Sequence, residues 1–69
     1  MLIIKHQGAY YTDKYEIQGT VIMICHSNVK EQAKVFNNEE EIKEETKNMK
    51  NYEYEIEEIE NEYKSKYRN

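Results

Sequence analysis

The longest uninterrupted apolar run in this chain is Val21 to Cys25, inside the segment TVIMICH (Thr20 to His26). The run contains β-branched valine and isoleucine, which are enriched in strands. A short apolar run without polar alternation is typical of a strand that the rest of the protein covers on both faces. The segment therefore predicts a central strand of a β-sheet.

The residues before this run also favour strands. The sequence LIIKH at residues 2–6 predicts a short first strand, and Gly8 permits a turn after it. Residues 9–18, AYYTDKYEIQ, are rich in strand-forming residues, although Thr12-Asp13-Lys14 is also compatible with a turn. Gly19 predicts a turn or a bulge before the central strand.

The segment VKEQAKVF (residues 29–36) fits two interpretations. It fits a short helix capped by Ser27, with Val29, Ala33 and Phe36 on one side. It fits equally well the return of a hairpin that ends in a strand over residues 33–36. The sequence leaves both open.

A helix is predicted from about residue 39 to residue 49. Asn38 followed by Glu41 has the spacing of a capping box, and three consecutive glutamates suit the positive end of the helix dipole. Lysines at positions 43, 47 and 50 follow at spacings that allow pairing with glutamates one turn away. Ile42, Thr46 and Met49 would line the buried side of this helix.

The segment NYEYEIEEIENEY (Asn51 to Tyr63) carries two periods at once. Alternation of tyrosine and isoleucine with glutamate predicts a strand from residue 52 to about residue 59. The same segment has apolar residues spaced 4, 3 and 4 apart, which predicts a helix continuing to about residue 67: Tyr52, Ile56, Ile59 and Tyr63. We favour the strand because Asn48 and Asn51 are poor helix formers.

These elements predict an α+β fold in a single domain over residues 1–69. We expect a small antiparallel β-sheet of three to four strands with one main helix packed on it. If the helical period prevailed, the fold would be a β-hairpin followed by one long C-terminal helix. Residues 64–69 (KSKYRN) are basic, and we expect them to fray in either case.

Negative charge is concentrated in the second half of the chain. Residues 39–62 contain eleven glutamates and three lysines, a net charge of −8, whereas the whole chain carries −4. Either period in the last segment places glutamates on one side and tyrosine and isoleucine on the other, so an acidic ridge is expected. Direct binding of nucleic acid is not expected, because it requires the opposite charge. A basic surface on a protein partner is the expected target.

The candidate partner-binding residues come from this last segment. The glutamates of the ridge would speed association, and the tyrosines would anchor the complex. The predicted residues are Glu53, Glu55, Glu57, Glu58, Glu60 and Glu62, with Tyr52, Tyr54 and Tyr63 as anchors.

No motif for catalysis or cofactor binding occurs, and no enzyme activity, cofactor or metal is expected. Cys25 and His26 are adjacent, so on a strand they face opposite sides, and Cys25 is interpreted as a core cysteine. His6 and His26 would approach each other if the strands at residues 2–6 and 20–26 pair. Two histidines and one cysteine without ordered spacing are a weak signal for zinc.

The size and composition of the chain suggest its oligomeric state and its compartment. A chain of about this length buries only roughly 60% of its unfolded surface, so a homodimer or a tightly bound partner is expected. A single cysteine excludes an intramolecular disulfide, and there is no run of about 18 apolar residues. A cytoplasmic protein with no membrane span is therefore expected.

In size and acidity the chain resembles small proteins encoded by phages and other mobile elements of bacteria. The resemblance implies an inhibitor of a host nucleic-acid enzyme or defence system, of the anti-CRISPR or anti-restriction type that mimics DNA. Two other hypotheses are a self-associating structural accessory protein and a small-molecule or nucleotide sponge. The sponge would use Tyr10, Tyr11, Lys14 and His26 between protomers.

Overall fold

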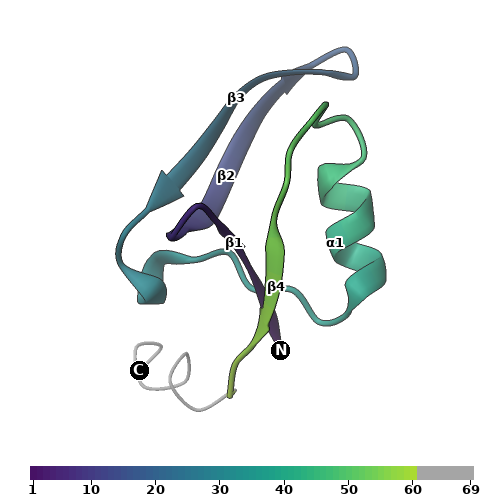
Figure 1. Ribbon diagram of the computed structural model, residues 1–69. Coiled ribbons are helices and arrows are strands. Elements are labelled where there is room, and N and C mark those ends of the chain that lie inside the picture. Colours follow the sequence, from purple (N-terminus) through teal and green to yellow (C-terminus); the bar gives the residue numbers. More distant parts are fainter. Residues whose placement is uncertain (61–69) are drawn as a thin grey trace, which may run out of the picture.

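The computed structural model describes residues 1–60, which form one four-stranded antiparallel sheet with one short helix packed on it (Figure 1). The α+β prediction is confirmed, although the helix is shorter than expected. Within residues 1–60 the last segment forms a strand over residues 55–58, shorter than the predicted span of 52 to about 59, and the predicted continuation of the helix does not form there. The elements are β1 (Leu2–His6), β2 (Ala9–Ile17), β3 (Thr20–Ser27), the 3-10 turn η1 (Lys30–Gln32), α1 (Glu39–Thr46) and β4 (Glu55–Glu58).

Two tight turns of the same sequence join the first three strands. Gln7-Gly8 links β1 to β2 and Gln18-Gly19 links β2 to β3, and all four residues have positive φ. Two consecutive positive φ values are the signature of the type I′ turn, whose twist matches that of the strands it joins. Both glycines therefore act as turn residues, as the sequence indicated.

The strand order is β3-β2-β1-β4, so the predicted central position of Thr20–His26 is wrong. β3 is an edge strand, and within residues 1–60 it pairs with β2 alone. β1 is the strand that pairs with a neighbour on both sides. It also has a fully buried isoleucine on each face, Ile3 on one and Ile4 on the other. Apolar character alone does not distinguish a central strand from an exposed one, because strand order depends on pairing with distant segments.

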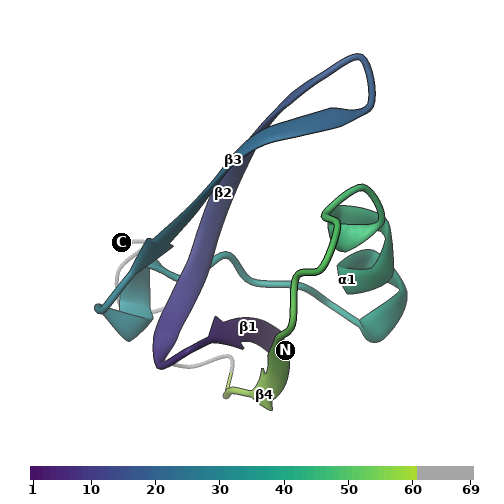
Figure 2. The ribbon, with the colours of Figure 1, turned by 45° about the horizontal axis from the view of Figure 1, so that its top comes forward.

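The hairpin of β2 and β3 projects from the rest of the sheet as a long arm (Figures 1 and 2). β2 runs without interruption through Thr12-Asp13-Lys14, so the turn considered there does not form. Instead the register shifts between Tyr11 and Asp13, which leaves Thr12 as an extra residue in β2. Such bulges increase strand twist, which is consistent with the strong twist of the arm.

The segment between β3 and α1 takes neither of its two predicted forms. Only the three-residue turn η1 is helical, and only Phe36 forms a bridge, with Leu2. Both backbone hydrogen bonds of that bridge, in each direction between Leu2 and Phe36, are 2.8 Å long. The segment therefore runs between β1 and β2, bonded to Leu2 and Tyr11, as an irregular strap rather than as a helix or a strand.

The cap of α1 agrees with its sequence. The Asn38 side chain accepts a hydrogen bond from the Glu41 backbone N–H at 2.9 Å, and the Glu41 carboxylate accepts one from the backbone N–H of Asn37. The helix ends at Thr46, three residues before the predicted end, and the Asn48 amide bonds to Glu16 of β2. The chain then reverses at Asn51, which has φ of 58°.

The core consists of two hydrophobic clusters, one on each face of the sheet. The larger lies under α1 and contains Ile4, Tyr11, Phe36, Ile42 and Met49. The smaller lies on the other face, under the strap, and contains Ile3, Ala33 and Ile59. As predicted, Ile42 and Met49 are buried, while Thr46 is half-buried and donates a hydrogen bond to the Ile42 carbonyl.

Candidate functional site

The glutamates of the predicted ridge lie on and around β4. Opposite residues of paired strands point to the same face, so Glu55 and Glu57 share a face with their partners Lys5 and Ile3 of β1. Glu58 lies opposite Leu2 and therefore points to the α1 face of the sheet. The glutamates of β4 thus divide between two faces, and they do not form one continuous row.

The protein's own lysines stand beside two of these glutamates. Lys30 of η1 forms an ion pair with Glu57 at 2.5 Å. Lys5 lies directly opposite Glu55 in the β1–β4 pairing. The charge of Glu57 is therefore compensated within the molecule, whereas Glu55 only lies opposite a lysine whose Nζ is over the Tyr10 ring. Sequence periodicity gave no sign of either arrangement, because both lysines come from distant segments.

Tyr52 and Tyr54 are half-buried against the larger core cluster. Their rings stack on each other at 5.7 Å between centroids, and Tyr52 also stacks on His6 at 4.6 Å. Burial, and to a lesser degree the neighbouring Tyr54, raises the pKa of Tyr52 to about 12. These two rings hold the segment before β4 on the sheet, and only their exposed parts are available to a partner.

The acidic groups that remain accessible lie at the start of α1 and at both ends of β4. Glu39 and Glu40 are exposed in the first turn of α1. Glu53, Glu58 and Glu60 are exposed and form no ion pair with another residue of the described range 1–60. Glu62 and Tyr63 lie outside the described residues, as does the basic segment 64–69. We call Glu39, Glu40, Glu53, Glu58 and Glu60 the acidic surface.

Glu45 is a residue whose role the sequence interpretation missed. Its carboxylate accepts a hydrogen bond from the Tyr11 hydroxyl at 2.5 Å and forms an ion pair with Lys34 at 2.9 Å. Its backbone carbonyl accepts a hydrogen bond from Lys14 at 2.7 Å. Burial, and then the bond to Glu45, raises the pKa of Tyr11 well above its usual range. Glu45 follows buried Ile42 by three residues, so both lie on the same face of the helix. That spacing was the sequence signal that Glu45 points toward the sheet.

His6 and His26 do meet, although β1 and β3 are not paired. Their rings stack with centroids 5.1 Å apart, and His26 Nε2 lies 2.7 Å from the Tyr52 hydroxyl. His6 Nδ1 bonds to the Glu53 carbonyl. Within residues 1–60, histidine, cysteine, aspartate and glutamate nowhere gather in threes in a geometry suited to a metal ion.

Acidification below about pH 6.5 is expected to destabilise the protein through this histidine pair. Burial, and then the charge of His6, lowers the pKa of His26 from 6.5. The unfolded chain therefore binds a proton at a pH where the folded protein does not, so the stabilisation is complete above 6.5 and falls as the pH drops through the folded-state pKa. Urea unfolding on either side of pH 6.5 measures this effect.

The variant His26→Gln is the control for that measurement. Its stability should depend less on pH over the same window, which lies above the range where glutamates titrate. An equal pH dependence in the variant and the parent would show that other groups cause it.

The four residues proposed for a small-molecule sponge do not share one face, although Tyr11 and His26 are neighbours with ring centroids 6.4 Å apart. Tyr10 packs against the smaller cluster and Tyr11 lies in the larger one, so the two rings face opposite sides of the sheet. Lys14 is engaged by Glu16 and by the Glu45 carbonyl. Tyr11 and Lys14 are thus engaged in contacts within the fold.

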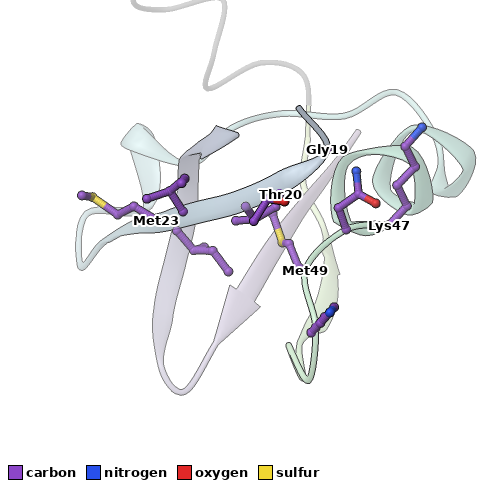
Figure 3. Close-up of a pocket in the computed structure, with 10 residues that line it drawn as sticks. Gly19, Thr20, Met23, Lys47 and Met49 are labelled. Atoms are coloured by element: carbon purple, nitrogen blue, oxygen red, sulfur yellow. The ribbon is translucent and has the colours of Figure 1, made fainter. Parts of the chain in front are cut away.

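An open pocket of about 570 Å³ lies between the tip of the β2–β3 arm and the segment after α1. Figure 3 shows Thr20 and Met49 facing each other there, while the side chain of Met23 points away from Met49. Of its polar groups, Lys47 is paired with Glu44 and Asn48 with Glu16. We interpret the pocket as the space beneath the arm.

Comparisons with known proteins find no match. No protein-family model, no curated protein and no solved structure is similar to this chain. Among the described residues, no helix has the length and apolar character needed to cross a membrane.

Proposed function

We propose that this protein is a non-enzymatic binding protein that docks its acidic surface on a basic surface of a protein partner. The observation that carries the proposal is the charge of residues 38–60. This segment holds ten glutamates and three lysines, a net charge of −7, and it forms α1, the following loop and β4. Lys30 and Lys34 compensate part of this charge by pairing with Glu57 and Glu45, and the remaining negative charge attracts a cationic surface and repels nucleic acid.

The lysines beside β4 determine which carboxylates are expected to contribute most to binding a basic partner. Glu55 and Glu57 face Lys5 and Lys30, so they contribute less to an external field than their number suggests. Glu39 and Glu40 occupy the first turn of α1, and no lysine of residues 1–60 forms an ion pair with them. The first turn of α1 and the exposed glutamates around β4 are therefore the proposed points of contact.

The basic surface of the partner is proposed to be a nucleic-acid-binding groove. A groove that binds phosphates presents lysine and arginine at close spacing, and carboxylates on a rigid helix and strand can occupy the same positions. Binding there would exclude DNA or RNA and inhibit the partner. An inhibitor of this kind, encoded by a phage or another mobile element, is the biological role that we propose.

Neutralising the acidic surface is expected to weaken partner binding by about tenfold or more. Four exposed charge pairs at roughly 0.3–0.5 kcal/mol each account for that factor. The variant Glu39→Gln/Glu40→Gln/Glu58→Gln/Glu60→Gln would be compared with the parent as bait in a bacterial extract. The affinity of a retained protein would then be measured at low and at raised salt, with a DNA oligonucleotide as competitor.

The control is Asp13→Asn on the β2–β3 arm, which removes a negative charge that lies outside the acidic surface. It should bind as the parent does. Equal affinity of the parent and the fourfold variant, or binding that salt does not weaken, would contradict the proposal. Binding that salt weakens but DNA does not displace would retain the basic partner and reject the nucleic-acid groove.

A further inference from the structure

The β2–β3 arm differs from the acidic surface in both charge and exposure. Residues 9–27 contain three charged residues, Asp13, Lys14 and Glu16, and Lys14 forms an ion pair with Glu16 at 2.9 Å. On the same arm, four large apolar side chains are more than half exposed. These are Tyr15 at 57%, Ile17 at 62%, Ile22 at 62% and Met23 at 53%, and we call them the arm patch.

Two members of the arm patch, Tyr15 and Met23, lie on the side of the arm that faces away from α1. Lys14 and Glu16 point toward the helix, since they bond to Glu45 and Asn48. Tyr15 alternates with them and therefore points the other way, together with Met23 directly opposite it on β3. Contiguous exposed apolar groups on a small protein are characteristic of an interaction site.

Within residues 1–60, β3 also offers a backbone edge without a pairing partner. It is eight residues long, it pairs with β2 alone within residues 1–60, and none of its residues is a lysine, arginine, aspartate, glutamate or proline. Natural sheets protect exposed edges with charges, proline or short length. The other edge strand, β4, has that protection, since three of its four residues are glutamates. The unprotected edge of β3 is therefore the one suited to pairing with a further strand.

We infer that this protein forms a homodimer in which the β3 strands of two copies pair antiparallel, with the arm patches packed in the same interface. Antiparallel pairing of identical strands creates a two-fold axis, and each copy then presents the same surface to the other. The two four-stranded sheets would join into one sheet of eight strands. If β3 paired instead with β4 of another copy, each added copy would leave one edge strand unpaired, and the assembly would grow without closing.

The distribution of charge favours a second copy over a strongly charged partner at this surface. Two chains of net charge −4 repel each other, and they approach most easily through the region that carries the least charge. The arm is that region, while the acidic segment 38–60 lies on α1 and β4. Dimerisation through β3 therefore leaves both acidic surfaces free, in agreement with the proposed function but independent of it.

The area required for a stable dimer includes both the edge and the patch. Specific interfaces bury at least about 600 Å² on each partner. The arm patch supplies only part of that area, because Tyr15 and Ile17 lie on β2, one strand away from the paired edge. The remainder must come from the backbone and side chains along β3. A dimer held by the patch alone is thus not expected.

The test is the molar mass in solution, measured by sedimentation equilibrium over a range of concentrations. The parent should reach twice the chain mass of 8.4 kDa, and Met23→Lys should remain at the chain mass. Lysine on the edge strand brings two like charges, one from each copy, into the paired edge of the dimer. Tyr15→Lys, on β2 and outside the paired edge, should weaken the dimer less than Met23→Lys does.

The matched control is Ile56→Lys, which introduces the same charge at a partly exposed apolar residue of the other edge strand. It should dimerise as the parent does. Circular dichroism of each variant verifies that the chain is folded, and the thermal midpoint should rise with concentration for the parent and not for Met23→Lys.

Three outcomes would overturn the inference. A parent protein that stays monomeric at all concentrations excludes the dimer. A dimer lost in Ile56→Lys but kept in Met23→Lys places the interface elsewhere, and assembly that grows beyond two copies excludes the closed two-fold arrangement. The fourfold glutamine variant separates this inference from the proposed function, because it should lose the basic partner and retain the dimer.

Discussion

Replacing Ile4 by alanine is expected to lower the free energy of unfolding by about 2–5 kcal/mol. Ile4 is fully buried in the larger core cluster, on a strand paired on both sides. The change removes buried methyl groups and leaves a cavity that the surrounding sheet and helix cannot close. A chain of 69 residues has a total stability of roughly 3–10 kcal/mol, so much of this variant should be unfolded in water.

The matched control is Ile22→Ala, the same chemical change in the longest apolar run of the chain. Ile22 is mostly exposed at the register shift between β2 and β3, so its replacement should alter the stability by about 0.5 kcal/mol or less. Both changes should be made in the Met23→Lys background, so that loss of association does not contribute. Urea unfolding measures the two effects, and Ile4→Val provides a milder variant. Equal effects at Ile4 and Ile22 would contradict the strand order.

Replacing Tyr11 by alanine is expected to cost about 3–5 kcal/mol. Tyr11 is fully buried, its ring stacks on Phe36 with centroids 6.4 Å apart, and its hydroxyl bonds to Glu45. Its loss would remove packing from the larger cluster and leave the Glu45 carboxylate with Lys34 as its remaining partner. Urea unfolding would measure the loss, and the tyrosine fluorescence of the other rings would report on the fold.

Tyr11→Phe separates packing from hydrogen bonding at this position. It keeps the ring and removes the hydroxyl, so it should cost about 1.5–3 kcal/mol, the range for a hydrogen bond to a charged group. No change in Tyr11→Phe would mean that the bond to Glu45 does not stabilise the fold. A cost equal to that of Tyr11→Ala would mean that the ring packing contributes nothing.

Local sequence signals predicted most of the secondary structure. The strand at residues 2–6, the turns at Gly8 and Gly19, the Asn38 cap and the strand character of residues 55–58 all follow from residue types within a few positions of each other. Turn geometry and capping are local properties, which explains their success. The helix end and the strap at residues 29–36 were less well predicted, because contacts with the sheet determine them: Asn48 bonds to Glu16, and Phe36 bridges Leu2.

The sequence indicated the negative charge of the candidate site but only part of the arrangement of its side chains. The accumulation of glutamate is a property of composition, and it places the acidic surface on α1 and β4. The pairing of Glu57 with Lys30 and the position of Lys5 opposite Glu55 are not visible in either period of the segment. The tyrosines expected as anchors, Tyr52 and Tyr54, are instead partly used to pack the segment on the sheet.

The sequence by itself determined the α+β class, the capped helix and the separation of an acidic second half from a nearly neutral first half, because these depend on near neighbours and on composition. Only the tertiary structure decided that LIIKH is the doubly paired strand and that TVIMICH lies at an edge. The physical reason is that strand order is set by pairing between segments far apart in the chain. An apolar run satisfies its preference for burial equally well inside one chain or, as we propose for β3, between two.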